Sequence, residues 1–195
     1  NDVNFLTDVD SGHLCVMLSA KDINDIKVEQ QKLAEAAKLD SMTMLLNHEA
    51  TMDCIKLILK NEHDRQHALF MIDIDNFKDL NDTMGHRFGD EFLIELSREL
   101  KRIFRETDIV GRIGGDEFFV LMRNISDKTQ VEGKAKDILS AIRKTSSKYA
   151  KINLSGSVGI SIYPDNGENL DELYQKADSA LYDVKGNGKN SFTFA

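Results

Sequence analysis

Two acidic residues follow a pair of glycines between two apolar segments. Gly114 and Gly115 precede Asp116 and Glu117, and an apolar run lies on either side of the four residues. Adjacent glycines readily supply the positive φ angles of a tight hairpin turn. We expect the two acids at the tip of a β-hairpin, where they face water or a ligand. A plain solvated turn is the alternative that this motif on its own leaves open.

A third acid, Asp73, ends the continuous apolar run Ala68–Ile72, which has the composition of a central strand covered on both faces. If this strand pairs with the hairpin, Asp73 and Asp116 meet at one end of a sheet. Two carboxylates, with substrate phosphates as the other ligands, are a common way to bind Mg²⁺. The sequence therefore predicts a divalent-cation site at this end.

Groups that can bind phosphate and purine accompany these acids. The helix that follows the strand offers free backbone N–H groups, and Lys78, Lys185 and Lys189 offer positive charge. Asn81 and Asp90 flank a glycine-containing break. A carboxylate accepts from guanine N1–H and the exocyclic amine together, while an amide meets the neighbouring acceptor and donor. Helix capping is the alternative role for these two side chains.

Hydrophobic periodicity predicts the elements that position these residues. We expect helices over 47–60, 76–85, 92–104, 131–142 and 170–184, and strands over 68–72, 108–113, 118–122, 151–163 and 191–195. In the first helix the pattern predicts burial of Ile55, Leu57, Ile58 and Leu59. The order of elements predicts an α+β fold with a mixed central β-sheet covered by helices.

The first 39 residues have a different character. Residues 1–21 contain a strand that leaves a hairpin. Residues 22–39 carry a helical seam with alternating three- and four-residue steps, formed by Ile23, Ile26, Gln30, Leu33 and Ala37. Such a seam suits a short parallel coiled coil, or equally an amphipathic helix docked on its own domain.

Composition narrows the functional classes. The chain has 195 residues, is 41% hydrophobic and carries a formal charge of −8, which suits one core and argues against binding to nucleic acid. Cys15 and Cys54 are expected to be reduced core thiols, which favours the cytoplasm. No stretch is apolar enough to span a bilayer, and the chain begins at Asn1. We therefore expect a piece of a longer protein, attached to a membrane only through upstream segments.

An ordered series of motifs carries a more specific signal. It consists of Asp73–Lys78, Asn81-Asp82, Gly85-His86, Gly89-Asp90, Gly114–Phe118, Ala177-Asp178, Ala180–Tyr182, Lys185 and Gly188–Asn190. Over residues 40–195 the series resembles the GGDEF family of diguanylate cyclases. The resemblance implies a palm-like fold related to nucleotidyl cyclases. It also implies condensation of two GTP molecules into cyclic di-GMP, with release of two pyrophosphates, in a homodimer whose subunits each hold one GTP.

The resemblance implies roles for individual residues. Asp73, Asp116 and the Ile74 carbonyl would ligate Mg²⁺ or Mn²⁺. GTP would be bound by Phe77, Lys78, Asn81, Asp90, Gly115, Lys185 and Lys189, among which Asn81 and Asp90 read guanine and the lysines hold phosphates. Asp116 is also the candidate base for the ribose 3′-hydroxyl, and Glu117 supports a second metal or the turn.

Arg105 and Asp108 precede the hairpin with the spacing of the family's inhibitory product site. An arginine can hold guanine or phosphate in a bidentate fork, and Asp108 can accept from a guanine edge. We therefore expect inhibition by cyclic di-GMP, although an R-x-x-D sequence taken alone is more often a solvated ion pair.

The sequence departs from the family pattern at three positions. In the opening motif, residues 40–48, Met44 replaces the Gly of the family and His48 replaces its Arg. These changes affect the local turn and one ionic contact. Lys189 occupies a position where Arg is frequent in the family. It offers a single ammonium charge to a phosphate in place of a bidentate guanidinium. Ahead of the motif, Asp22–Lys27 is similar to the end of a PAS sensor domain and its exit helix, which would set how two cyclase domains face one another.

Two other functions stay open. A non-catalytic module would sense GTP or cyclic di-GMP through Arg105 and Asp108, but the acids Asp73, Asp116 and Glu117 argue against it. An enzyme that makes a mixed GMP-AMP cyclic dinucleotide would be expected to have a different residue at position 90. This chain has an aspartate there, which argues for guanine in both halves.

Overall fold

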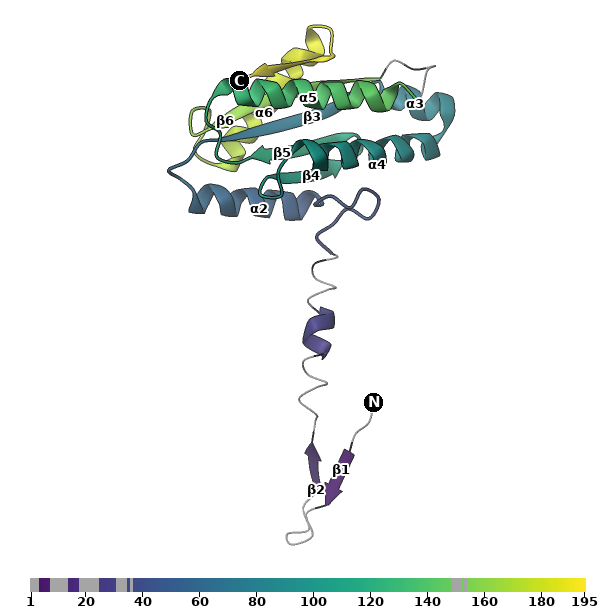
Figure 1. Ribbon diagram of the computed structural model, residues 1–195, viewed down its shortest axis with the longest axis vertical. Helices are drawn as coiled ribbons and strands as arrows, with labels where there is room; N and C mark the ends of the chain where they lie inside the picture. Colours follow the sequence, from purple (N-terminus) through teal and green to yellow (C-terminus); the bar gives the residue numbers. More distant parts are fainter. Residues whose placement is uncertain are drawn as a thin grey trace. The chain divides into compact units, whose positions relative to one another are not determined.

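The computed structural model describes residues 4–7, 14–17, 25–30, 35, 37–148, 152 and 154–195 (Figure 1). The chain divides into two compact units, Asn1–Lys38 and Leu39–Ala195. In the first, β1 (Asn4–Thr7) pairs antiparallel with β2 (Leu14–Met17), and residues 25–30 are helical. Ile26 in that helix is exposed. Ile23 and Leu33 of the predicted seam lie outside the described residues.

The second unit has the predicted order of helices and strands. Its elements are α2 (His48–Asn61), β3 (His67–Asp75), α3 (Phe77–Met84), α4 (His86–Ile103), β4 (Ile109–Gly114), β5 (Glu117–Met122), α5 (Lys128–Ser146), β6 (Ser155–Tyr163), α6 (Leu170–Gly186) and β7 (Ser191–Phe194). The strands form a five-stranded sheet in the order β4-β5-β3-β6-β7. All neighbours are antiparallel except β6 and β7. The expected α+β fold with a mixed sheet is confirmed.

Helices cover both faces of this sheet, which explains why β3 is apolar throughout most of its length. Phe70 and Ile72 pack in a core with residues of α4 and α5, while Leu69 and Met71 pack in a second core with residues of α2 and α6. Figure 1 shows α4 and α5 side by side across the sheet. Because successive side chains of a strand point to opposite faces, β3 supplies both cores.

Four details differ from the sequence expectations. Leu57 is 59% exposed, because the buried face of α2 is formed by Thr51, Ile55 and Leu59. The predicted strand over 151–163 begins only at Ser155, and residues 151 and 153 lie outside the described part. Cys54 is a free thiol, but it is only partly buried. The fourth difference concerns Gly114 and is described with the hairpin.

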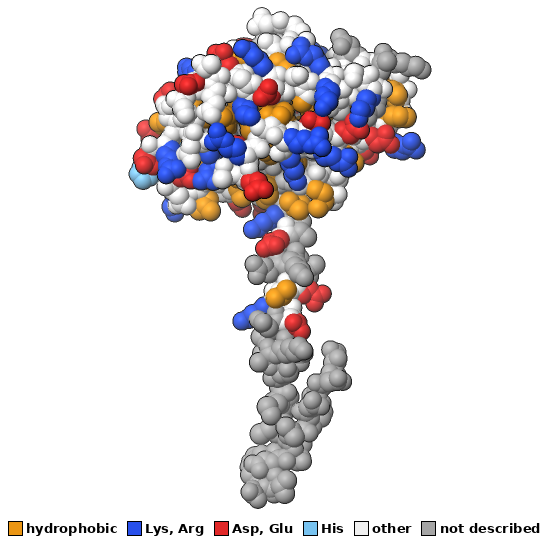
Figure 2. All heavy atoms as spheres, viewed as in Figure 1, with side chains coloured by type: hydrophobic (Ala, Val, Ile, Leu, Met, Phe, Trp, Pro, Cys, Tyr) orange, Lys and Arg blue, Asp and Glu red, His pale blue; other side chains and the backbone are white. Residues whose placement is uncertain are grey.

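The face that α4 and α5 present to solvent carries charges of both signs (Figure 2). Lys148 pairs with Glu95, and Lys144 and Arg102 pair with Glu99. These acids interrupt the basic surface, so the face does not offer an unbroken row of cations. Within the described ranges, no helix combines the length and the apolar character needed to cross a membrane.

Candidate active site

The hairpin between β4 and β5 brings Asp116 and Glu117 close to Asp73 near the end of β3. Asp73 on β3 is the direct cross-strand partner of Glu117 on β5, and β3 continues for two more residues beyond this pair. Gly115 has a φ of +50°, as the turn requires, whereas Gly114 is the last residue of β4 and pairs with Glu117. The expectation that both glycines supply positive φ angles is therefore wrong for Gly114.

The carboxylates of Asp73, Asp116 and Glu117 lie close enough at this end of the sheet for their charges to affect pKa values. Burial, followed by the negative charge of Asp73, raises the pKa of Asp116. The pKa of Glu117 is raised by burial and then by the charges of Asp73 and Asp116. Lys185 on α6 partly compensates, because its Nζ lies 2.8 Å from Asp73 Oδ2. The cluster thus holds more negative charge than its own cations neutralise.

This donor set fits a hard divalent cation. Mg²⁺ and Mn²⁺ prefer oxygen ligands, and the Lys185 ammonium already lies against Asp73 as a cation would. In the described part of the chain, no group of three or more His, Cys, Asp or Glu side chains is arranged to hold a metal. One or two carboxylates, as at this end of β3, are the kind of protein ligand that binds Mg²⁺ together with substrate phosphates.

Arg112 connects the hairpin turn to the beginning of the second unit. Its Nε and Nη2 donate to the carbonyl of Gly115 at 3.0 and 2.8 Å, and its Nη1 lies 3.2 Å from both carboxylate oxygens of Asp40. Burial acts to raise the pKa of Asp40, but hydrogen bonds from Thr43 and the Arg112 charge outweigh it and hold that pKa below its usual value. One side chain thus fixes the turn that carries Asp116.

Asp75 holds the phosphate-binding candidates of α3 and α6 near each other. This buried carboxylate accepts hydrogen bonds from the hydroxyls of Ser155 and Ser157, at 2.6 and 2.7 Å, and from the backbone N–H of Asn190, at 3.2 Å. The turn after α6 is thereby held at the end of β3. Its residue Lys189 donates to Asn76 Oδ1, at the start of α3, over 2.9 Å.

The purine candidates lie where α3 meets α4. Asn81 is half-buried on α3, Asp90 is exposed on α4, and Gly85 between the helices has a φ of +92°. Asn81 Oδ1 is buried and, among the described residues, has no hydrogen-bond partner. Phe77 packs against Phe92 beside it. The exposed Asp90 carboxylate is thus accessible to a base, whereas the Oδ1 end of the Asn81 amide is buried.

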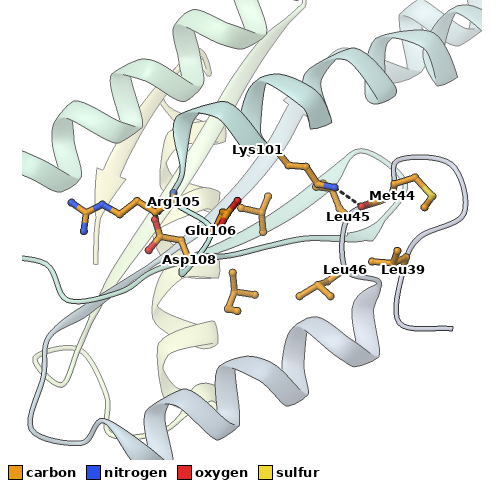
Figure 3. A pocket seen from close by; sticks show the side chains of 10 residues that line it. Leu39, Met44, Leu45, Leu46, Lys101, Arg105, Glu106 and Asp108 are labelled. Atoms are coloured by element: carbon orange, nitrogen blue, oxygen red, sulfur yellow. Dashed lines mark hydrogen bonds between the residues drawn. The ribbon is translucent and has the colours of Figure 1, made fainter. Parts of the chain in front are cut away.

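Arg105 and Asp108 border a groove of about 500 Å³ between the end of α4, β4 and residues 39–46 (Figure 3). Asp108 is buried, and its two oxygens accept backbone N–H groups of Arg105 and Arg123 at 2.9 and 3.0 Å. Arg105 is exposed and points away from Lys101, which donates to the Met44 carbonyl at 2.6 Å. The structure therefore gives Asp108 a role in fixing the loop and leaves the Arg105 side chain accessible.

Comparison with known proteins identifies the family to which this fold and site belong. The family model described as "Diguanylate cyclase, GGDEF domain" matches residues 37–191. The chain belongs to the GGDEF domain family. The match covers strands β3 to β6, helices α2 to α6 and every site residue described above.

Individual relatives agree with this assignment. The diguanylate cyclase TpbB of Pseudomonas aeruginosa is 32% identical over 84% of this chain and 38% of its own length. The solved GGDEF domain of TpbB has a TM-score of 0.73, with 32% identity over 80% of this chain and 94% of that one. The cyclic di-GMP phosphodiesterase PdeR of Escherichia coli is 32% identical over 91% of this chain and 27% of its own length. The chain thus spans less than half of these curated relatives.

A microbial GGDEF domain solved in a study of its interaction with cyclic di-GMP is 26% identical to this chain. It has a TM-score of 0.65, and the match covers 84% of this chain and 99% of that one.

Two residues of this GGDEF domain were missed by sequence reasoning. Arg112 was counted as part of an apolar strand, although a lone arginine among apolar residues is itself a signal of a specific partner. Asp75 is part of the motif Asp73–Lys78, but no role was predicted for it. Its spacing of two from Asp73 puts both acids on one face of β3, which could have identified it.

Proposed function

We propose that this GGDEF domain is a diguanylate cyclase, which condenses two GTP molecules into one cyclic di-GMP and two pyrophosphates. The observation that carries the proposal is the meeting of Asp73, Asp116 and Glu117 at one end of the sheet, with Lys185 paired to Asp73. An acidic cluster next to cationic and purine-binding candidates matches the needs of a metal-dependent nucleotidyl transfer.

Asp73 and Asp116, together with the Ile74 carbonyl, would hold Mg²⁺ or Mn²⁺. When bound, the ion would stabilise negative charge on the α-phosphate and lower the pKa of the attacking hydroxyl. Lys78, Lys185 and Lys189 would hold the phosphates, as the exposure of all three side chains allows. Phe77 and Gly115 would contact the nucleotide, and Glu117 would support the turn or a second ion.

In the proposed reaction, the 3′-oxygen of one GTP forms a bond to the α-phosphorus of the other. The bond from that phosphorus to the bridging oxygen of pyrophosphate breaks, and the hydroxyl proton goes to Asp116. With the cation bound, its charge would lower the pKa of the 3′-hydroxyl, which would favour transfer of the proton to the neighbouring Asp116 carboxylate. In a second step of the same kind, the other 3′-oxygen attacks the remaining α-phosphorus, which closes the ring and releases the second pyrophosphate.

Guanine selection is assigned to Asn81 and Asp90. The exposed Asp90 carboxylate can accept from N1–H and the 2-amino group of guanine, which adenine lacks. An adenine in the same place would leave the acid unpaired, so ATP should be rejected.

The reaction requires two domains, since each would hold one GTP. We therefore propose a homodimer, with residues 22–39 as a signalling helix and residues 1–21 as the end of a PAS-like sensor. The antiparallel pair β1 and β2, followed by the helical residues 25–30, is compatible with such a segment. A cytoplasmic location for the catalytic domain is part of the same proposal.

Product inhibition through Arg105 is the regulatory part of the proposal. The side chain is exposed beside the groove and can bind guanine or phosphate of cyclic di-GMP in a bidentate fork. Asp108 would act by holding the loop and, through its remaining lone pairs, by accepting from a guanine edge.

Incubation of the chain with GTP and Mg²⁺, followed by separation of the nucleotides and a pyrophosphate assay, tests the function. We expect one cyclic di-GMP for every two pyrophosphates. The same reaction with equal GTP and ATP should give no mixed dinucleotide. The match to a protein named as a phosphodiesterase raises a second candidate, a nucleotide-sensing module. A dimer that binds GTP without turnover would support that candidate and contradict the proposal.

A further inference from the structure

Helices α3 and α4 contact each other at Gly89, a residue without a side chain. Gly89 lies on the first turns of α4 and is buried against Asn81 and Phe77 of α3. A Cβ atom at position 89 would lie 2.1 Å from Asn81 Oδ1, 3.0 Å from Asn81 Cγ and 3.0 Å from Phe77 Cζ. No real Cβ contact is as short as the first of these. The Asn81 amide therefore occupies the space that any other residue at position 89 would fill.

This placement also sets the direction of the amide. The Oδ1 end of Asn81 is the part nearest to Gly89, and it is buried without a hydrogen-bond partner among the described residues. The Nδ2 end of the planar amide is consequently turned away from α4. Asp90, the other residue assigned to the base, follows Gly89 directly on the same helix. The distance between Asn81 and Asp90 thus depends on how closely α3 approaches α4 at Gly89.

We propose that Gly89 is a specificity-determining positioning residue, which seats the Asn81 amide so that Asn81 and Asp90 can address one guanine together. The inference rests on the proposed function, because it takes these two residues as the base-binding pair. A side chain at position 89 would push the Asn81 amide out of its place. Guanine recognition would weaken while the acids at the end of β3 stay unchanged.

The test compares Gly89→Ala with Gly133→Ala. Gly133 is an exposed glycine of α5 whose Cβ would meet no atom within 4 Å, so it controls for the change of residue type in a helix. The probe for binding is α,β-methylene GTP, which cannot release pyrophosphate. We expect Gly89→Ala to raise the Kd of the probe and the KM for GTP about tenfold, with kcat changed less than about twofold. Gly133→Ala should alter none of the three. Equal constants for the two variants would overturn the proposal.

A double-mutant cycle decides whether Gly89 acts through Asn81. In the Asn81→Ala background, Gly89→Ala should cause no further rise in Kd, because the group it displaces is absent. An undiminished rise would overturn the proposal. If Gly89→Ala alone fails to fold, the double variant should fold and match Asn81→Ala in Kd. A double variant that also fails to fold would show that Asn81 is not the obstructed group, and would likewise overturn it.

Wild-type behaviour separates this inference from the proposed function. A chain that binds the probe but forms no cyclic di-GMP would contradict the cyclase activity, and the binding data would still test Gly89. A chain that does not bind the probe at all would overturn both.

Discussion

Burial and neighbouring charge make Asp116 suitable for its proposed role as a metal ligand. Its raised pKa reflects an unfavourable concentration of negative charge, which a bound cation would relieve. Lys185 and Arg112 reduce the repulsion only in part, since the pKa of Asp116 stays above its usual value despite them.

His67 offers a test of stability at the other end of β3. The imidazole is fully buried, its Nδ1 accepts the Asn124 N–H at 3.3 Å, and Nε2 lies 3.4 Å from the Glu62 carbonyl. Burial lowers its pKa below the usual 6.5, an effect that the nearby Glu62 only partly offsets. The folded protein therefore keeps His67 neutral at a pH where the unfolded chain is already protonated.

Because the unfolded state binds the extra proton, the free energy of unfolding should fall as the pH falls through 6.5 toward the lowered pKa, and level off above 6.5. Urea unfolding at pH 7.5 and pH 5.5 measures this. We expect wild type to lose about 1 kcal/mol more than His67→Gln, which keeps a donor and an acceptor without titrating. Equal losses in the two proteins would contradict the assignment of a neutral His67.

Residues 40–46 form a turn whose backbone suits the glycine that the family usually has there. Met44 has a φ of +57° and is 53% exposed, and its carbonyl accepts from Lys101. The Asp40 side chain accepts from Thr43 within the same turn. The turn thus keeps its hydrogen bonds although methionine is strained in this conformation.

Met44→Gly should stabilise the domain by about 0.5 to 1 kcal/mol, because glycine adopts positive φ without a steric penalty. Met44→Ala is the matched control, since it removes the side chain and retains the strain. Denaturant unfolding measures both. A Gly variant no more stable than the Ala variant would contradict the strain argument.

The loop after α4 carries Arg105, the residue through which we propose product inhibition. Arg105→Ala should weaken inhibition by cyclic di-GMP about tenfold, because it removes a charge-assisted fork from an exposed position. Arg102→Ala removes an exposed arginine one turn earlier in α4 and serves as control. The measurement is the inhibition constant in the GTP assay. Unchanged inhibition in Arg105→Ala would remove this residue from the site.

Asp108 is unsuitable for that experiment. Its carboxylate is buried and accepts two backbone N–H groups, so its removal would leave both without partners and disturb the loop itself.

Local patterns predicted the elements well where one side of a helix or strand is clearly buried. In α5, the apolar residues at helical spacing are all buried, namely Val131, Ala135, Ile138, Leu139 and Ile142. The pattern failed at Leu57 in α2, because a run of apolar residues does not say which of them faces water. Hairpin geometry likewise depends on which strand residue pairs last, so Gly114 could not be separated from Gly115 in advance.

At the scale of the whole molecule, the site depends on partners that are far apart in the chain. Arg112 and Asp40 are separated by 72 residues, and Asp75 and Asn190 by 115. The family resemblance supplied the candidates for metal, base and phosphate, since those residues lie in recognisable motifs. The family resemblance gave no motif for the contacts of Arg112 with Asp40 and of Asp75 with Asn190. Those links follow from the pairing of distant segments, namely the bridge between Leu46 and Gly111 and the strand order β3-β6-β7, which no local pattern encodes.

That strand order also supplies a control for the central claim. Asp165 is an exposed carboxylate on the turn after β6. The end of β6 that precedes it pairs with His67, at the opposite end of β3 from Asp73. A change from carboxylate to amide at Asp165 alters the same chemical group far from the proposed reaction.

The most direct measurement is the turnover of GTP to cyclic di-GMP with Mg²⁺ by Asp116→Asn and Asp165→Asn, beside thermal unfolding of both. We expect Asp116→Asn to lose at least about 100-fold in kcat while unfolding no earlier than wild type, because the change relieves charge repulsion. Asp165→Asn should keep wild-type turnover. A folded Asp116→Asn that turns over GTP as fast as Asp165→Asn would contradict the account.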